Sequence, residues 1–248
     1  MIILKSLKEI ELMRQAGKIV SATLAELGEA IRPGITTLEL DALARRCIKK
    51  SGGSPAFLGY HGFPANICTS INEEVVHGIP SLRRLKSGDI ISIDVGVCYK
   101  GYYGDATVTF PVGEISQLAK QLIEVSQSAL YKGIDQACVG NRLYDISNAI
   151  QVTAESAGFS VVRNYVGHGI GSQMHEEPQV PNFGAPGKGP KLEAGMVLAI
   201  EPMVNAGTWE VETLQDSWTV VTKDRKLSVH FEHTVAILED GPEILTVL

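Results

Sequence analysis

Two apolar stretches with a two-residue alternation lie close together in the 248-residue chain, at residues 89–98 and 104–111. Both are rich in Ile, Val, Thr and Tyr, and Lys100-Gly101 lies between them, which is typical of two β-strands joined by a tight turn. Alternation puts the apolar side chains of the first strand on one face and Asp94 on the other. The chain is therefore predicted to contain a β-hairpin on which Asp94 and Asp105 lie opposite or nearly opposite each other.

Two carboxylates at this spacing need an explanation, because cross-strand neighbours have Cβ atoms about 4.5–5.5 Å apart and like charges there destabilise the pair. One interpretation is a pair of solvated carboxylates on an exposed face, which is the more common arrangement for two aspartates. The other interpretation is that the two side chains hold divalent cations between them.

Three further polar residues, each in an apolar or glycine-rich strand context, favour the metal site. His168 stands within Gly167-His168-Gly169-Ile170-Gly171, Glu201 follows the apolar run 197–200, and Glu232 opens the apolar run 232–237. With the two aspartates they make four carboxylates and one imidazole. Such a set is typical of a dinuclear site in which bridging carboxylates hold two metal ions roughly 3.5–4 Å apart.

Helical patterns flank the hairpin on both sides. Ser6 with Glu9, and Thr36 with Glu39, have the spacing of capping boxes, which predicts two helices before the hairpin. Residues 1–248 are predicted to form a single α+β domain, with two similar halves around one curved antiparallel sheet covered by helices. After the hairpin we predict helices over 115–139 and 142–157, strands at about 160–165, 196–204, 218–223, 227–238 and 242–247, and a hairpin turn at Asp240-Gly241.

Composition argues against several classes of protein. The chain has 22 basic and 28 acidic residues, a formal net charge of −6, whereas broad contact with nucleic acid needs an excess of Lys and Arg. No apolar run approaches the roughly 20 residues of a membrane-spanning helix, and the start of the chain does not read as a signal peptide. Its four cysteines form no close pair, which favours reduced thiols in the cytoplasm over a disulfide scaffold. The HExxH, GxSxG and P-loop motifs are absent.

A series of short motifs, taken in order, spans most of the chain. Any one of them is weak, but together they closely resemble the type I methionine aminopeptidases, in the short bacterial form, of the pita-bread metallopeptidase family. Glu201 and Glu232 are too close in sequence for the long helical insert of type II enzymes, and we expect no zinc-finger extension. The motifs are Gly59-Tyr60-His61-Gly62-Phe63-Pro64, Ser70-Ile71-Asn72-Glu73, His77-Gly78-Ile79-Pro80, Asp94-Val95-Gly96, Gly104-Asp105, Gly167-His168-Gly169-Ile170-Gly171, His175-Glu176-Glu177-Pro178, Ile200-Glu201-Pro202 and Phe231-Glu232-His233-Thr234.

The resemblance implies a pita-bread fold, a metal site and a reaction. Asp105 and Glu232 would bridge two divalent ions, whose identity among Mn, Fe, Co and Zn depends on availability. The reaction would remove the N-terminal methionine from nascent proteins, preferring a small second residue, by a water activated between the two ions. The metal ligands would be Asp94, Asp105, His168, Glu201 and Glu232.

The resemblance also assigns roles to catalytic and substrate-binding residues. Glu201 would shuttle a proton, while His77 and His175 would contact the substrate beside the metal ions. Without the motifs, the aromatic residues of the pocket would be interpreted as ordinary core packing. The methionine side chain would lie against Tyr60, Phe63, Cys68, Met174 and Trp218.

Two other functions stay open on the sequence alone. Xaa-Pro aminopeptidases and prolidases share the five ligands, although they typically carry an extra N-terminal domain. A non-catalytic binding protein could keep the fold, although such proteins usually lose ligands. We expect a cytoplasmic monomer that binds peptides or nascent chains with a free N-terminal methionine, associates with the ribosome, and binds neither membrane nor nucleic acid by itself.

Overall fold

The computed structural model describes residues 1–247. The capping boxes predicted at Ser6 with Glu9 and at Thr36 with Glu39 are both present, and they start the first two helices. The later pair of helices starts and ends inside the predicted ranges. The helices are α1 (Leu7–Ala30), α2 (Thr37–Lys50), α3 (Gln117–Ile134) and α4 (Leu143–Ser156).

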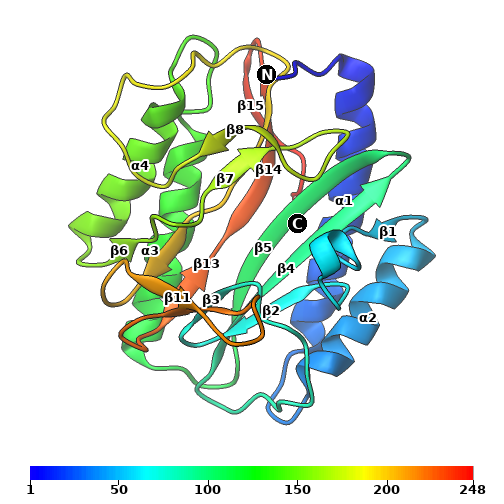
Figure 1. Ribbon diagram of the computed structural model, residues 1–248, viewed down its shortest axis with the longest axis vertical. Coiled ribbons are helices and arrows are strands. Elements are labelled where there is room, and N and C mark those ends of the chain that lie inside the picture. The colour runs from blue at the N-terminus through cyan, green and yellow to red at the C-terminus, as the bar shows by residue number, and fades with distance from the viewer. Residues whose placement is uncertain (248) are drawn as a thin grey trace.

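The strands form one large curved sheet and two small sheets, and their order in space differs from their order in the chain (Figure 1). Their bounds are β1 (Ser54–Pro55), β2 (Cys68–Ile71), β3 (Glu74–Val76), β4 (Ile90–Tyr99), β5 (Tyr102–Pro111), β6 (Ser160–Val161), β7 (Gly167–Gly169), β8 (Glu176–Val180), β9 (Val197–Ile200), β10 (Met203–Asn205), β11 (Val211–Thr213), β12 (Val220–Thr222), β13 (Ser228–His230), β14 (Glu232–Leu238) and β15 (Gly241–Ile244). The large sheet runs β1-β4-β5-β14-β9-β7-β8, with β2 beside β4 and β15 beside β14. The small sheets are β13-β10-β6 and β11-β12-β3.

The predicted hairpin is confirmed as β4 and β5. Tyr99 pairs with Tyr102, so the turn consists of Lys100 and Gly101 alone, and both have positive φ, at 49° and 83°. Asp94 pairs with Thr107 rather than with Asp105, which lies two positions earlier in β5. The two aspartates are therefore diagonal neighbours, close to the predicted arrangement.

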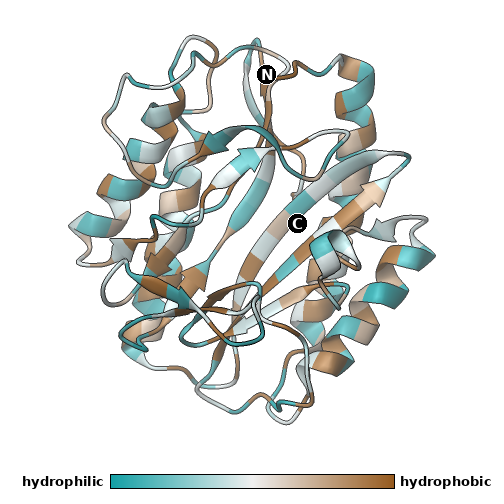
Figure 2. Ribbon diagram, viewed as in Figure 1, coloured by the Kyte–Doolittle hydropathy of each residue, from teal (hydrophilic) through white to brown (hydrophobic). Residues whose placement is uncertain are grey.

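Each half of the large sheet is covered by its own pair of helices. On one side α1 lies against β4 and β5, where Val20 shares a buried core with Ile93. On the other side α3 and α4 pack together, and Ile146 shares a second core with Val235 of β14. Figure 1 shows the two helix pairs on opposite sides of the view, and Figure 2 shows polar and apolar residues mixed along each helix, as helices covered on one side require. The predicted α+β class and the two halves are confirmed.

Two predicted strands are each divided by a short break. Glu201 and Pro202 separate β9 from β10 within the predicted strand 196–204, because proline cannot donate to a strand ladder. Phe231 separates β13 from β14 within 227–238, where the chain passes from a small sheet into the large one. Both divisions lie beside residues that enter the site described below.

The predicted turn at Asp240-Gly241 is wrong by one residue. Gly241 already pairs with Leu238, so the turn consists of Glu239 and Asp240. Gly241 has φ of 130° and begins β15, a conformation that glycine adopts readily. The short strands β1, β3, β7, β8 and β11 were absent from the prediction, because two to five residues carry too little periodicity to be recognised.

Candidate active site

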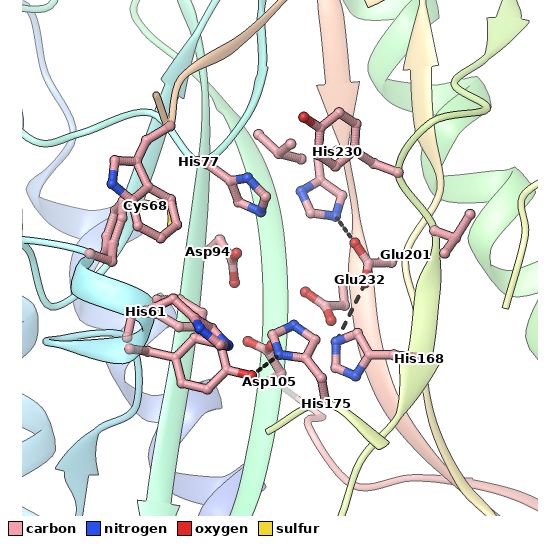
Figure 3. A pocket seen from close by; sticks show the side chains of 17 residues that line it. His61, Cys68, His77, Asp94, Asp105, His168, His175, Glu201, His230 and Glu232 are labelled. Carbon is pink, nitrogen blue, oxygen red and sulfur yellow. Dashed lines mark hydrogen bonds and ion pairs between the residues drawn. The ribbon is translucent and has the colours of Figure 1, made fainter. Parts of the chain in front are cut away.

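Adjacent strands of the large sheet each bring one chemically reactive side chain to the same place (Figure 3). In spatial order β4 carries Asp94, β5 carries Asp105, β14 opens with Glu232, β9 is followed directly by Glu201, and β7 carries His168. All five predicted ligands line a single cavity. The curvature of an antiparallel sheet thus gathers residues that are far apart in sequence.

The spacing of these side chains suits a shared cation. One ligand atom from each of Asp105, His168 and Glu232 lies within 4.8 Å of the others. His168 Nε2 lies 3.6 Å from Glu201 Oε1. The Thr107 hydroxyl donates to Glu232 Oε2 at 2.9 Å, which fixes one oxygen of that carboxylate.

The tautomer of His168 follows from its other ring nitrogen. Nδ1 lies 2.8 Å from the carbonyl oxygen of Gly169, which can only accept a hydrogen bond. Nδ1 therefore carries the proton, and the lone pair of Nε2 faces the carboxylates. Metal-ligating histidines are commonly oriented by such a contact to a backbone carbonyl.

Burial makes the charged forms of these side chains costly. Asp105 and Glu232 are 3% and 2% exposed. Burial, followed by repulsion from Glu232, raises the pKa of the Asp105 carboxyl well above its ordinary range. Burial and repulsion also raise the pKa of Glu201 and Glu232, and burial lowers the pKa of His168 to about 3. Four carboxylates in one buried site demand a positive charge or protons to balance them.

The same side chains leave polar atoms without partners. Within residues 1–247, three carboxylate oxygens and one imidazole nitrogen at this site are buried and accept or donate no hydrogen bond. Such atoms are costly to bury unless something binds them. Oxygen donors with a neutral imidazole suit divalent Mn, Fe, Co or Zn, so the residues present fit a metal centre. The atoms are Asp94 Oδ1, Asp105 Oδ1, Glu232 Oε1 and His230 Nε2.

The cavity that these ligands line has a volume of about 430 Å³, and aromatic side chains form another part of its wall. The Phe63 and Trp218 rings meet edge to face in its wall, with centroids 5.1 Å apart. Six of the seven residues expected to bind substrate line this cavity. Met174 does not: it is buried in the apolar cluster that also contains Phe63 and Cys68. The six lining residues are Tyr60, Phe63, Cys68, His77, His175 and Trp218.

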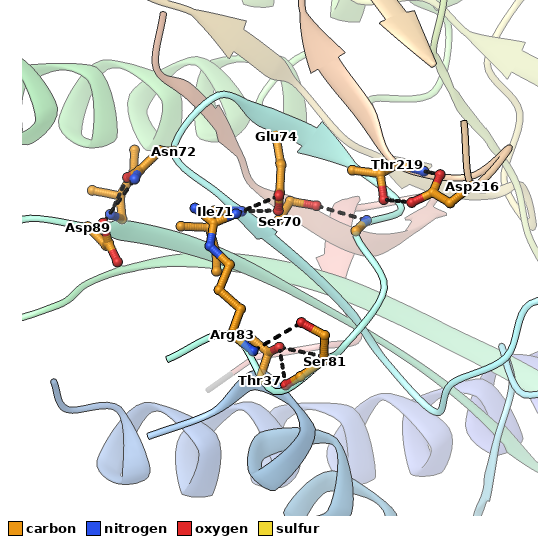
Figure 4. Close-up of polar contacts among 12 residues, drawn as sticks. Thr37, Ser70, Ile71, Asn72, Glu74, Ser81, Arg83, Asp89, Asp216 and Thr219 are labelled. Carbon is orange, nitrogen blue, oxygen red and sulfur yellow. Dashed lines mark hydrogen bonds and ion pairs between the residues drawn. The ribbon is translucent and has the colours of Figure 1, made fainter. Parts of the chain in front are cut away.

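A network of polar contacts holds the segment that presents His77 (Figure 4). His77 has φ of 60°, which is uncommon for a residue with a side chain. The next residue, Gly78, donates its N–H to Ser70 Oγ at 3.3 Å, and a Cβ at Gly78 would collide with the carbonyl of Thr69. Glu74 accepts from the N–H of Ile71 at 2.7 Å and closes the preceding turn.

Trp218 is positioned by a second local turn, which Figure 4 also shows. Asp216 accepts from the backbone N–H of Trp218 and of Thr219, and from the Thr219 hydroxyl at 2.6 Å. This turn sets the direction from which the indole enters the cavity wall. The ring centroid of Trp218 lies 6.4 Å from that of His77.

His175 is held by two aromatic neighbours. Its Nδ1 lies 2.7 Å from the Tyr60 hydroxyl, and its ring centroid lies 4.2 Å from that of His168. Burial lowers the pKa of His175, and burial with repulsion from His230 lowers that of His77 to about 4. Both rings are therefore neutral near pH 7 and can act as hydrogen-bond donors.

The structure adds His230, which the sequence prediction missed. It is 2% exposed, lines the cavity, and its Nε2 lies 3.5 Å from Glu201 Oε2. Because it stands two positions before Glu232, two-residue alternation would have put both side chains on one face. The predicted strand 227–238 contains both residues, so this signal could have identified His230. His61 and Tyr165 also line the cavity and were not singled out as site residues.

The curved sheet, the carboxylate cluster with its histidine and the adjoining apolar cavity define the class of protein as a metallopeptidase. The sequence matches the profile of Metallopeptidase family M24 over residues 11–239.

Individual proteins of similar sequence and structure show to which group within this family the chain belongs. The chain is 60% identical to the methionine aminopeptidase of Clostridium perfringens over 100% of both chains, and 58% identical to methionine aminopeptidase 1 of Bacillus subtilis over 99% of both. The crystal structure of methionine aminopeptidase from Thermotoga maritima matches with a TM-score of 0.99 at 49% identity, covering 100% of both chains. The chain belongs to Metallopeptidase family M24 and, within it, to the methionine aminopeptidases. The pita-bread fold and the resemblance indicated by the motifs are confirmed.

Prolidases share the fold at a greater distance. The prolidase of Pyrococcus furiosus is 25% identical with a TM-score of 0.80, and this chain covers 66% of that chain. The prolidase alternative is therefore not favoured.

Proposed function

We propose that this protein is a metal-dependent aminopeptidase that removes the N-terminal methionine from proteins with a small second residue. The observation that carries the proposal is the cluster of four carboxylates and His168 within one cavity of about 430 Å³, part of whose wall is aromatic. Identities of 58–60% to methionine aminopeptidases over their whole length support it. Residues 1–248 would act as one catalytic domain.

Two divalent cations would be held by side chains from five neighbouring segments of the sheet. When bound, they would supply Lewis-acid chemistry, polarising the scissile carbonyl and lowering the pKa of the attacking water. Asp105 and Glu232, which are 3% and 2% exposed, would be among the side chains that hold them. The proposed ligands are Asp94, Asp105, His168, Glu201 and Glu232.

Glu201 is the proposed proton shuttle. Its carboxylate lies between His168 and His230, at 3.6 and 3.5 Å, and burial raises its pKa well above the ordinary range. Once ionised, this carboxylate can take a proton from the attacking water and deliver it to the leaving amine.

His175 and His77 are proposed to contact the peptide. With the Tyr60 hydroxyl donating to Nδ1 of His175, the ring proton lies on Nε2, which can donate to the oxygen of the tetrahedral intermediate. His77, beside Trp218 and Tyr165, would orient the peptide near its second residue.

The apolar wall would select methionine. A flexible thioether side chain adapts to an aromatic-lined pocket and gains sulfur–aromatic contacts. Tyr60, Phe63, Cys68 and Trp218 would touch it directly, and Met174 would support them from behind. Crowding by the ligands beside the scissile bond would favour a small second residue.

Localisation and partners are also part of the proposal. No helix within residues 1–247 is long and apolar enough to cross a membrane. The four cysteines are free thiols. We propose a cytoplasmic monomer that acts on nascent chains at the ribosome, with no nucleic-acid binding of its own.

A peptide assay tests the proposed reaction. The purified protein, supplied in turn with Mn²⁺, Fe²⁺, Co²⁺ or Zn²⁺, is given Met-Ala-Ser and Ala-Pro peptides. Release of methionine from Met-Ala-Ser without cleavage of the Ala-Pro peptide supports the proposal. Cleavage of only the Ala-Pro peptide would instead indicate a prolidase-like enzyme, and cleavage of neither with metal bound would indicate a binding protein.

A further inference from the structure

A buried ion pair joins the N-terminal segment to the loop that carries His175. Lys5 Nζ lies 2.6 Å from Glu176 Oε2, and the two side chains are only 3% and 6% exposed. Glu176 directly follows His175 in the chain. The ion pair lines no part of the active-site cavity, and neither residue belongs to the machinery proposed above.

Both partners are anchored by further hydrogen bonds. The backbone N–H of Lys5 donates to the Gly195 carbonyl at 2.7 Å, and its Nζ also donates to the Ile3 carbonyl at 2.9 Å. The second carboxylate oxygen of Glu176 accepts from the N–H of Gln173 at 3.1 Å. The pair therefore links a fixed N-terminal segment to a closed turn at 173–176.

The turn belongs to the connection between β7 and β8, which carries Met174 and His175. β7 contains His168, and β8 begins at Glu176, which pairs with Gly169 after an irregularity in register. The connection is tied to β5 at one point, where the N–H of Tyr103 donates to the Gly171 carbonyl at 2.9 Å. Besides the Tyr60 contact of the His175 ring, the Lys5–Glu176 ion pair holds the residue directly after His175.

The ion pair packs directly over the connection. A Cβ at Gly171 would lie 2.5 Å from Glu176 Oε1 and 2.5 Å from Lys5 Cε, so only glycine leaves room for the pair. The packing fixes the backbone on which His175 stands, while Tyr60 and His168 fix its ring.

We propose that Lys5 is a positioning residue for His175, acting through Glu176; this inference rests on the proposed function. Removing one partner of a buried ion pair leaves the other charge uncompensated, which strongly favours rearrangement toward water. A hydrated Glu176 would open the turn at 173–176 and carry the His175 ring away from Tyr60. Misplacement of a catalytic group by about 1 Å can lower a rate as much as 100-fold.

A double-mutant cycle tests the inference on the metal-loaded enzyme. Lys5→Met is expected to lower kcat on Met-Ala-Ser about tenfold or more with a small change in KM and unchanged metal content. In the His175→Ala background the same substitution is expected to cause no further loss, because its effect passes through His175. An equal loss in both backgrounds, or no loss in either, overturns the proposal.

Two more variants separate positioning from general stability. Lys5→Met combined with Glu176→Gln removes both charges and keeps the acceptor for Gln173, so it should recover most of the lost kcat. If Lys5→Met alone does not fold, the double variant is used to measure kcat in its place. Arg14→Met is the matched control, because Arg14 joins α1 to β15 through Glu243 on the surface, and it should leave kcat near that of the unmodified protein.

A readout independent of catalysis keeps this inference distinct from the proposed function. Amide exchange in residues 170–176 and the ring NMR signal of His175 are measured with and without diamagnetic Zn²⁺. Faster exchange there and a shifted His175 signal in Lys5→Met support the positioning role even if no methionine is released. Unchanged exchange and an unchanged His175 signal contradict it even in an active aminopeptidase.

Discussion

The Tyr60 hydroxyl lies 2.7 Å from Nδ1 of His175, although the two residues come from opposite halves of the chain. Tyr60 belongs to a short 3₁₀ turn at Tyr60–Gly62, and His175 ends the connection between β7 and β8. The contact therefore joins the two halves of the chain in the cavity wall, and a Tyr60 hydroxyl that donates to Nδ1 leaves the proton of the neutral His175 ring on Nε2.

Tyr60→Phe tests this contact. The substitution removes the partner of Nδ1 but keeps the aromatic ring in the cavity wall. The loss of one hydrogen bond, about 1 kcal/mol, corresponds to a drop in kcat of roughly fivefold. Steady-state kinetics with metal analysis should show a lower kcat and unchanged metal content.

His175→Ala should lower kcat further, and the variant should also retain its metal. Loss of metal from His175→Ala would mean that His175 is itself a ligand.

Asp105→Asn and Glu232→Ala test the metal assignment. Each removes one proposed bridging carboxylate from a site where the ligands already repel each other. We expect near-complete loss of peptide cleavage and lower metal content, while circular dichroism and thermal unfolding show a folded protein. Turnover like that of the unmodified enzyme from either variant would contradict the assignment.

The pH dependence of metal binding follows from the raised carboxyl pKa values. In the metal-free folded protein, burial raises the pKa of Asp105, Glu201 and Glu232, so these groups keep protons that the unfolded chain releases above about pH 4. Their contribution to metal-free stability therefore falls as pH rises through the raised values. His168, with its pKa near 3, is already neutral and releases no proton on binding.

Metal must displace the carboxyl protons, so its stabilising effect should grow with pH. We expect the rise in Tm caused by a fixed Mn²⁺ concentration to be larger at pH 7.5 than at pH 5.5. Differential scanning calorimetry of matched metal-free and metal-loaded samples measures it. An equal or larger rise at the lower pH would mean that the carboxylates are already ionised without metal.

Trp218→Ala tests the selectivity of the cavity. The indole packs edge to face on Phe63, and its loss opens the wall against which the methionine side chain would lie. We expect KM for Met-Ala-Ser to rise about tenfold, corresponding to roughly 1.4 kcal/mol of lost contact. Competition with norleucine and leucine peptides should show weaker discrimination. Unchanged KM and discrimination would place the methionine side chain elsewhere.

The regular elements could be predicted because their patterns are long. Alternation over residues 89–98 and 104–111 predicts β4 and β5, and it places Asp94 and Asp105 near each other. Capping boxes at Ser6 and Thr36 located the first two helices.

The rest of the site depends on elements too short to show a period. β7 has three residues, two of them glycine, so His168 was identified through its motif rather than through any strand pattern. His230 was missed because the motif that carries Glu232 begins at Phe231, although alternation in the predicted strand 227–238 puts His230 and Glu232 on one face. The sequence could not tell whether Met174 lines the pocket or packs behind it, since a residue in either place is buried among apolar side chains.

The most direct test is the release of methionine from Met-Ala-Ser by the protein stripped of metal and then reconstituted with two equivalents of Mn²⁺ or Fe²⁺. We expect no release from the metal-free protein and rapid release after reconstitution, with both effects lost in Asp105→Asn. Release that proceeds equally well without metal, or no release from a protein shown to hold two ions, would contradict a metal-dependent methionine aminopeptidase built on this cluster.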